Sequence, residues 1–192
     1  MNQITQLFNI KYPVVQGGMV WCSGWRLAAA VSEAGGLGII GAGSMRPDLL
    51  VEHINKIRKS GVATFGVNIP LLYPYAEDII DIVIKENVPV VFTSAGSPKK
   101  YTGVLKDNGA KVVHVVSSAK FAVKSEQAGV DAVVAEGFEA GGHNGREETT
   151  TLTLVELVKR SVRIPVIAAG GIATGRAILA AQNLGADGVQ IG

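Results

Sequence analysis

Short apolar segments rich in Val, Ile and Ala alternate with longer amphipathic segments along the whole chain, and this alternation constrains the fold more than any other feature. Each intervening segment is too long for a hairpin turn and long enough for a right-handed crossover between parallel strands. We therefore predict eight strands with seven intervening helices. The strands begin near Val14, Leu37, Phe65, Val90, Lys111, Ala132, Pro165 and Gly188. The helices lie near 24–34, 47–59, 75–86, 98–107, 118–128, 154–161 and 174–183.

Local signals mark several of the predicted helix ends. Pro47 suits the first turn of a helix, and Thr153 with Glu156 three residues later has the spacing of a capping box. Gly129 and Gly185 each precede an acidic residue and a strand. A left-handed glycine that ends a helix and leads directly into a buried strand explains both of these joints.

The strand pattern favours a (β/α)8 TIM barrel that reaches its eighth strand at the end of the chain. Strands buried on both faces read as continuous apolar runs, as these do. Polar and glycine clusters follow many different strands, and in a barrel all of those strand ends converge on one mouth, where active sites lie. A doubly wound open sheet is the alternative fold. The clusters are Gln16-Gly17-Gly18-Met19, Asn68, Ser94-Ala95-Gly96, Glu139 to Gly145, and Gly170-Gly171.

Composition narrows the classes of partner. The 192 residues are 47% hydrophobic and carry a dispersed net charge of +2, which predicts one globular domain with neither a nucleic-acid stripe nor a membrane patch. We expect small-molecule ligands. The single cysteine, Cys22, excludes an intrachain disulfide, and the first residues lack a signal-peptide pattern. No apolar run approaches the ~18 residues of a membrane helix, so a soluble, cytoplasmic protein is predicted.

The segment from Glu139 to Gly145 has the composition of an active-site loop. Its glycines allow the backbone to approach a ligand closely, and His143 can act as acid, base or hydrogen-bond donor near neutral pH. A glycine-rich surface turn with a solvated histidine is the alternative. The position of the loop after the sixth strand favours the catalytic interpretation of His143.

Two glycine turns follow the seventh and eighth strands, where barrels commonly bind phosphate. Ala168-Ala169-Gly170-Gly171-Ile172 and Gln190-Ile191-Gly192 occupy these places. Backbone N–H groups at such a turn, and at the helix start near Thr174, form an anion site. Tight strand-to-helix geometry is the structural alternative.

Several other reactive residues have structural explanations. His53 lies on an outer helix, where we expect a solvated side chain. His114 lies inside an apolar strand, and strand alternation leaves open whether it is a hydrogen-bonded core residue or faces a ligand. Glu136 and its acidic neighbours lack a clustered His or Cys set, so no metal site is predicted.

The loop after the first strand contains Trp21, Cys22 and Trp25. Packing at the barrel rim and contact with substrate explain these residues equally well. A cysteine nucleophile of the kind used by barrel nucleotide dehydrogenases is expected after the sixth strand, and Cys22 lies elsewhere.

Five motifs in order resemble the FMN-dependent nitronate monooxygenases, once called 2-nitropropane dioxygenases, and their relatives the flavin-dependent enoyl-acyl-carrier-protein reductases of the second type. The resemblance covers residues 1–192 and implies an FMN-binding TIM-barrel domain that is C-terminally truncated relative to the family. It implies that His143 is catalytic. The motifs are Gln16 to Met19, Ala34 to Gly38, Gly66 to Asn68, Glu139 to Gly145 and Ala168 to Ile172. The FMN contacts it implies are Gly17, Gly18, Met19, Asn68, Glu136, Gly141, Gly170, Gly171, Gln190 and Gly192.

The resemblance leaves the substrate open between two branches. Ala135-Glu136-Gly137 is typical of the enoyl reductases, whereas the stretch from Asn144 to Thr151 looks like the nitronate enzymes. We expect oxidation of alkyl nitronates or nitroalkanes with O2 to carbonyl compounds and nitrite, and the alternative is enoyl-thioester reduction with NAD(P)H. A non-catalytic flavin-binding fragment is a hypothesis of another class. Because the chain is truncated relative to the family, we expect a free 1–192 polypeptide to be marginally stable and to bind FMN weakly. A homodimer is possible.

Overall fold

The computed structural model describes residues 2–192 and contains the eight predicted strands and the seven predicted intervening helices. The strands are β1 (Val14–Gln16), β2 (Ile39–Gly41), β3 (Gly66–Pro70), β4 (Val90–Ser94), β5 (Lys111–Val116), β6 (Ala132–Glu136), β7 (Val166–Ala169) and β8 (Gly188–Ile191). The helices between them are α2 (Trp25–Glu33), α3 (Pro47–Lys59), α4 (Ala76–Lys85), α5 (Lys99–Asp107), α6 (Ala119–Gln127), α7 (Thr151–Ser161) and α8 (Gly175–Asn183). A 3-10 turn, η1 (Ala42–Ser44), follows β2.

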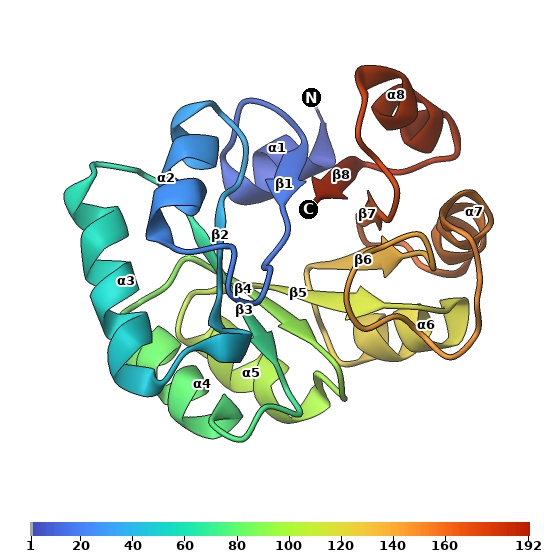
Figure 1. The fold of residues 1–192 in the computed structure, drawn as a ribbon. Coiled ribbons are helices and arrows are strands. Elements are labelled where there is room, and N and C mark those ends of the chain that lie inside the picture. Colours follow the sequence, from blue (N-terminus) through green and yellow to red (C-terminus); the bar gives the residue numbers. More distant parts are fainter. Residues whose placement is uncertain (1) are drawn as a thin grey trace.

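All eight strands belong to one parallel sheet in the order β1-β8-β7-β6-β5-β4-β3-β2, with the helices arranged outside it (Figure 1). The two ends of this order meet, because Val15 bridges to Leu37 just before β2. Gln16 N donates to Leu37 O over 2.9 Å, and Leu37 N donates to Val14 O over 2.9 Å. The predicted (β/α)8 barrel is therefore confirmed, and the alternative open sheet is excluded.

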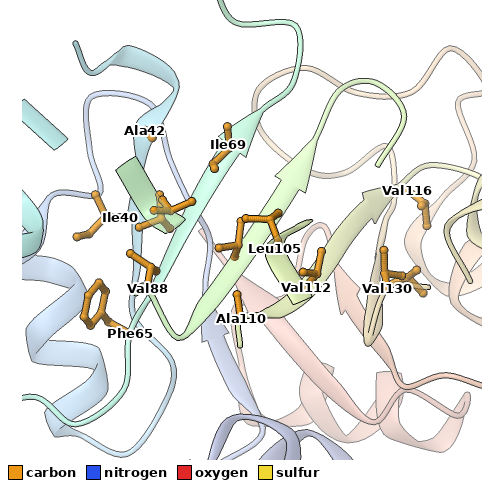
Figure 2. Close-up of a cluster of buried hydrophobic side chains, with 14 of the residues drawn as sticks. Ile40, Ala42, Phe65, Ile69, Val88, Leu105, Ala110, Val112, Val116 and Val130 are labelled. Atoms are coloured by element: carbon orange, nitrogen blue, oxygen red, sulfur yellow. The ribbon is translucent and has the colours of Figure 1, made fainter. Parts of the chain in front are cut away.

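Two apolar clusters lie on opposite sides of the strands, as expected for strands buried on both faces. The inner cluster fills the barrel and includes Val15, Phe92, Val134 and Ile167. The outer cluster lies between the strands and the helices, and Figure 2 shows part of it. Its members there include Ile40, Ile69, Leu105, Val112 and Val130.

A short helix before the first strand was not expected from the sequence. This helix, α1 (Gln3–Phe8), is capped by Asn2, whose Oδ1 accepts from the N–H groups of Ile4 and Thr5. Ile4 and Phe8 join the inner cluster, and the ring of Phe8 lies 6.0 Å from that of Phe92. The helix thus contributes apolar side chains to the barrel interior at the end opposite the mouth.

Most of the helix ends predicted from local sequence signals are confirmed. Pro47 is in the first turn of α3, and Gly129 and Gly185 have the left-handed φ values of 86° and 99°. The predicted capping box is wrong, because α7 begins at Thr151 and Thr153 is already inside the helix. The backbone N–H group at the start of α7 donates instead to the side chain of Glu139 in the preceding loop.

Candidate active site at the carboxyl ends of the strands

The strand register directs three predicted site residues into the barrel. Asn68 pairs with Phe92, while Glu136 and Gln190 both pair with Ala169. Phe92 and Ala169 belong to the inner cluster, and partners in a parallel ladder point to the same face. Asn68, Glu136 and Gln190 therefore lie on the inner face near the carboxyl ends of β3, β6 and β8.

The turn after β1 packs against this polar layer. A Cβ built on Gly18 would lie 2.3 Å from Asn68 Cβ, so only glycine fits there. A Cβ on Gly17 would lie 3.6 Å from the Gln190 side chain, and one on Gly192 would lie 3.6 Å from Met19 Sδ. The structure thus brings the residues predicted after β1 together with those of β3 and β8.

The turn after β7 presents a free backbone donor. Gly170 and Gly171 have left-handed φ values of 113° and 65°. Within residues 2–192, the N–H group of Gly171 finds no hydrogen-bond acceptor, whereas that of Gly170 faces Gln190 O across the β7–β8 ladder. A glycine turn with an unpaired N–H group can bind an anion.

The His143 loop after β6 is held by its own amide. Asn144 Nδ2 donates to the carbonyls of Phe138 and Ala140, at 3.0 and 3.1 Å. A Cβ on Gly145 would lie 2.3 Å from Ser117 Cβ, which keeps the loop against the end of β5. His143 is exposed, and a Cβ on Gly141 would meet no atom within 4 Å. The loop therefore presents His143 and open backbone to solvent.

Glu139, which the sequence did not single out alone, caps helix α7. Its Oε2 accepts from the N–H and the Oγ1 of Thr151, at 2.7 and 2.8 Å. Burial raises the pKa of the Glu139 carboxyl, but the hydrogen bonds from Thr151 outweigh it and hold the pKa below its ordinary value. A carboxylate therefore already occupies the start of α7. The twelve-residue separation of these partners follows no sequence rule.

Glu136 is the most perturbed acid of the mouth. Burial raises the pKa of its carboxyl to about 6. Within the described chain, no hydrogen bond or ion pair reaches that carboxyl. It can therefore carry or release a proton close to neutral pH.

The structure settles the open question of His114. Its strand partners are Thr93 and Val133, and Val133 belongs to the outer cluster. His114 therefore faces the helices, with Nδ1 2.7 Å from Thr93 Oγ1. Burial lowers the pKa of His114 to about 4, so it is a neutral core residue and does not face the mouth.

His53 is partly solvated, as predicted for an outer helix, but one of its ring nitrogens also caps a helix. Its Nδ1 accepts from the backbone N–H of Trp25 over 3.1 Å, at the start of α2. Gly24, the residue before that helix, has no side chain to cap it. A histidine 28 residues away supplies the missing acceptor, and its half-buried position lowers its pKa.

The other features of the loop after β1 divide into two groups. Trp25 packs against the outer cluster, so it is a structural residue. Trp21 and Cys22 are exposed. A cavity elsewhere is formed by the connections before β1, β2 and β3, and none of the predicted site residues lines it.

Two observations concern the described residues 2–192 as a whole. None of their helices has the length and apolar character required to cross a bilayer. In the same range, no three His, Cys, Asp or Glu side chains gather as a metal site would require.

The fold places the chain among the (β/α)8 barrels. A family model described as nitronate monooxygenase matches residues 1–192. A probable nitronate monooxygenase of Staphylococcus aureus (strain JH9) is 35% identical over an alignment that covers 100% of this chain and 66% of that protein. The chain belongs to the nitronate monooxygenase family, whose members are FMN-dependent oxidoreductases.

Solved structures agree with this membership. FabK from Thermotoga maritima is 54% identical with a TM-score of 0.97, and the match covers 100% of this chain and 61% of FabK. A nitroalkane oxidase from Streptomyces ansochromogenes is 30% identical with a TM-score of 0.88, and the match covers 99% and 67% of the two chains. The chain thus spans 66% of the length of the curated relative and 61% of FabK.

The mouth fits the FMN that the family implies. Its donors are neutral amides and the unpaired backbone N–H group of Gly171, which suit a phosphate and the polar edge of a flavin ring. The open backbone at Gly141 leaves room for a flat ligand.

Proposed function

We propose that this chain forms the FMN-binding barrel of an oxidoreductase in which His143 acts on the substrate. The observation that carries the proposal is the convergence of Asn68, Glu136 and Gln190 on the inner face of the barrel, beside the glycine turns that follow β1 and β7. Active sites of (β/α)8 barrels lie at this end of the strands. Family membership supports the same assignment.

The residues divide into two proposed binding roles. The backbone of Gly170 and Gly171, with Gln190 and Gly192, would hold the phosphate. The flavin ring would lie against the residues of the β1 turn, the inner face and the His143 loop, namely Gly17, Gly18, Met19, Asn68, Glu136 and Gly141. Support comes from the unpaired N–H group of Gly171 in the β7 turn and from the contact of Gly18 with Asn68.

FMN, when bound, would supply the group that accepts or passes on electrons. His143 would remove the α-proton of a neutral nitroalkane, because an imidazole is the side chain most often used as a general base. Asn144 would hold the loop that carries this base. The carboxyl of Glu136 would donate a proton to, or accept one from, a ligand bound at the mouth.

Alkyl nitronates and nitroalkanes are the first substrate class that we propose. The products would be carbonyl compounds and nitrite, with O2 as the second substrate. The 35% identity with a probable nitronate monooxygenase and the 30% identity with a nitroalkane oxidase support this assignment.

An enoyl thioester is the second substrate class, with NADH or NADPH as reductant. Two observations favour it. Glu136 stands in the Ala-Glu-Gly motif, and the 54% identity with FabK, an enoyl-acyl-carrier-protein reductase, exceeds the 35% identity with the probable nitronate monooxygenase. In this case His143 would orient or protonate the substrate.

The deciding experiment follows flavin absorbance under anaerobic conditions after FMN has been added to the purified chain. Bleaching by ethyl nitronate supports the first class, and bleaching by NADH or NADPH supports the second. Flavin that binds but stays oxidised with every reagent identifies a non-catalytic flavin-binding barrel. Failure to bind FMN contradicts the proposal.

Gly141→Ala provides a matched test of the cofactor contact. The added methyl group meets no protein atom within 4 Å, so the fold should tolerate it. A weaker FMN affinity with an unchanged unfolding midpoint would support contact between Gly141 and FMN. Equal FMN affinity in the two proteins would remove Gly141 from the site.

A further inference from the structure

The hydroxyl of Thr151 lies at the point where three segments of the mouth meet. Thr151 is the first residue of α7 and is only 4% exposed. A Cβ built on Gly137, at the start of the loop after β6, would overlap with Thr151 Oγ1. A Cβ built on Gly170, in the turn after β7, would lie 2.5 Å from the same atom. The hydroxyl therefore fills the space that these two glycines leave open.

This hydroxyl binds the carbonyl side of the β7 turn. Thr151 Oγ1 donates to Gly170 O over 3.0 Å, and Ala169 O lies 3.4 Å from the same hydroxyl. The carbonyl of Gly170 and the N–H group of Gly171 belong to one trans peptide, so they point in opposite directions. Within the described chain, that N–H group has no acceptor. The bond from Thr151 therefore holds one side of the peptide and directs the free donor of Gly171 away from the threonine.

The same bond makes the Gly171 N–H group a stronger donor. A hydroxyl carries one proton, and Thr151 Oγ1 also lies 2.8 Å from Glu139 Oε2. An anion that accepts from Gly171 N increases the negative charge on Gly170 O, because hydrogen bonds in a chain polarise one another. The Thr151 proton then moves toward Gly170 O, while Glu139 keeps its 2.7 Å bond from Thr151 N. Thr151 can thus support an anion without releasing the start of α7.

We propose that Thr151 is a positioning residue for the FMN phosphate: its hydroxyl orients the peptide between Gly170 and Gly171 so that Gly171 N donates to the phosphate. This inference rests on the proposed function and deepens it, because Thr151 acts through the β7 turn and touches neither the flavin ring nor the substrate. The phosphate is then the only part of FMN whose binding depends on the hydroxyl. A threonine with a merely structural role would change the affinity for every flavin alike.

Riboflavin separates these two roles, since it is FMN without the phosphate. Fluorescence titrations with both flavins give the flavin ratio, defined as the dissociation constant of riboflavin divided by that of FMN. Thr151→Val keeps the shape of the side chain and removes the hydroxyl, so FMN affinity should fall by about tenfold, the scale of one lost hydrogen bond. Riboflavin affinity should stay unchanged, so the flavin ratio should fall by the same factor. An equal loss of affinity for both flavins overturns the proposal.

Thr151→Ala is a second variant that does not depend on how valine packs. The valine methyl group must occupy the narrow space between Gly137 and Gly170, whereas alanine leaves that space empty and cannot clash there. Thr151→Ala should lower the flavin ratio as Thr151→Val does. A flavin ratio equal to that of the unmodified chain overturns the proposal.

Two further variants control for damage to the fold. Thr151→Ser keeps the hydroxyl and should retain the flavin ratio of the unmodified chain. Thr102→Val removes another buried threonine hydroxyl, which donates to Pro98 O over 2.9 Å at the start of α5. Thr102→Val should lower the unfolding midpoint and leave the flavin ratio unchanged. A reduced flavin ratio in either control overturns the proposal.

The outcome separates this inference from the proposed function. An unmodified chain that binds neither flavin contradicts the proposed function, and the role of Thr151 is overturned with it. An unmodified chain that binds both flavins equally well has no phosphate site, which overturns the phosphate role of the β7 turn. A preference for FMN that survives in Thr151→Val overturns only the role of Thr151.

Discussion

The side-chain amide of Gln16 makes the two hydrogen bonds to the backbone of Ile39 that a neighbouring strand would otherwise make. Gln16 Oε1 accepts from Ile39 N over 3.1 Å, and its Nε2 donates to Ile39 O over 3.2 Å. The two residues lie at the junction where β1 meets β2, which has one backbone bridge and no continuous ladder. One buried amide therefore extends the closure of the barrel beyond the single backbone bridge.

Replacing this amide should destabilise the barrel. Gln16→Met keeps a similar volume but leaves the buried N–H and C=O of Ile39 without these partners, at a cost of about 3 kcal/mol in the free energy of unfolding. Urea unfolding measures this difference. Gln127→Met, at an exposed position in α6, is the control and should change stability little. Equal stability of the two variants would show that the junction does not depend on the amide.

The fold could be predicted because eight apolar runs and seven crossovers allow few topologies. The topology also placed Gly17, Asn68 and Gln190 at one mouth, since parallel strands of a barrel end on the same side. The barrel side faced by Asn68 or His114 depends on register, which the sequence alone does not fix.

Other features depend on contacts between distant parts of the chain. His53 meets Trp25 and Glu139 meets Thr151 through tertiary packing, so no local pattern marks either pair. Helix α1 has only six residues, too few for a clear helical period.

A methyl group on Gly18 should disturb the flavin site. In Gly18→Ala the new Cβ would lie 2.3 Å from Asn68 Cβ, and relief of this clash must move Asn68 or the β1 turn. Overpacking of this kind costs about 1–3 kcal/mol, so FMN affinity should fall by about tenfold or more. Fluorescence titration with FMN measures the change. Gly103→Ala in α5, where a Cβ meets nothing within 4 Å, should bind FMN as the unmodified chain does.

Removal of the imidazole should separate binding from chemistry. His143→Ala leaves the proposed flavin contacts in place and should lower turnover by about 10²-fold or more while FMN affinity stays unchanged. A nitronate is already deprotonated, so its turnover should fall less than that of the neutral nitroalkane. Steady-state rates with both substrates test this, and equal losses would remove the role of base from His143.

The bond from Trp25 N to His53 predicts a loss of stability in acid. Burial lowers the pKa of His53 in the folded chain, with Glu52 opposing and Lys56 adding to the effect. Its contribution is therefore complete above the unfolded pKa of about 6.5 and is lost as the pH falls through the lower folded value. Protonated Nδ1 cannot accept from Trp25, and a lost helix cap costs about 1 kcal/mol.

Thermal unfolding across this pH range tests the cap. His53→Asn keeps an acceptor near the position of Nδ1 and does not titrate, so its midpoint should fall less on acidification than that of the unmodified chain. Parallel curves for the two proteins would show that His53 does not cap α2 through its neutral form.

Glu136 should show the opposite dependence on pH. Burial raises its pKa from 4.5 to about 6, so the folded chain disfavours the carboxylate. The protonated form is fully compatible with the fold below the unfolded value, and stability is lost as the pH rises through about 6. The difference between the two pKa values corresponds to about 2 kcal/mol in the free energy of unfolding.

Glu136→Gln removes this titration, so the flavin-free variant should be more stable than the unmodified chain by about that amount near pH 8 and equally stable below about pH 4.5. Urea unfolding at a series of pH values measures the difference, with the exposed Glu148→Gln as a control that should follow the unmodified chain. A constant difference between Glu136→Gln and the unmodified chain at every pH would mean that the Glu136 carboxyl is already ionised in the folded mouth and cannot share a proton there.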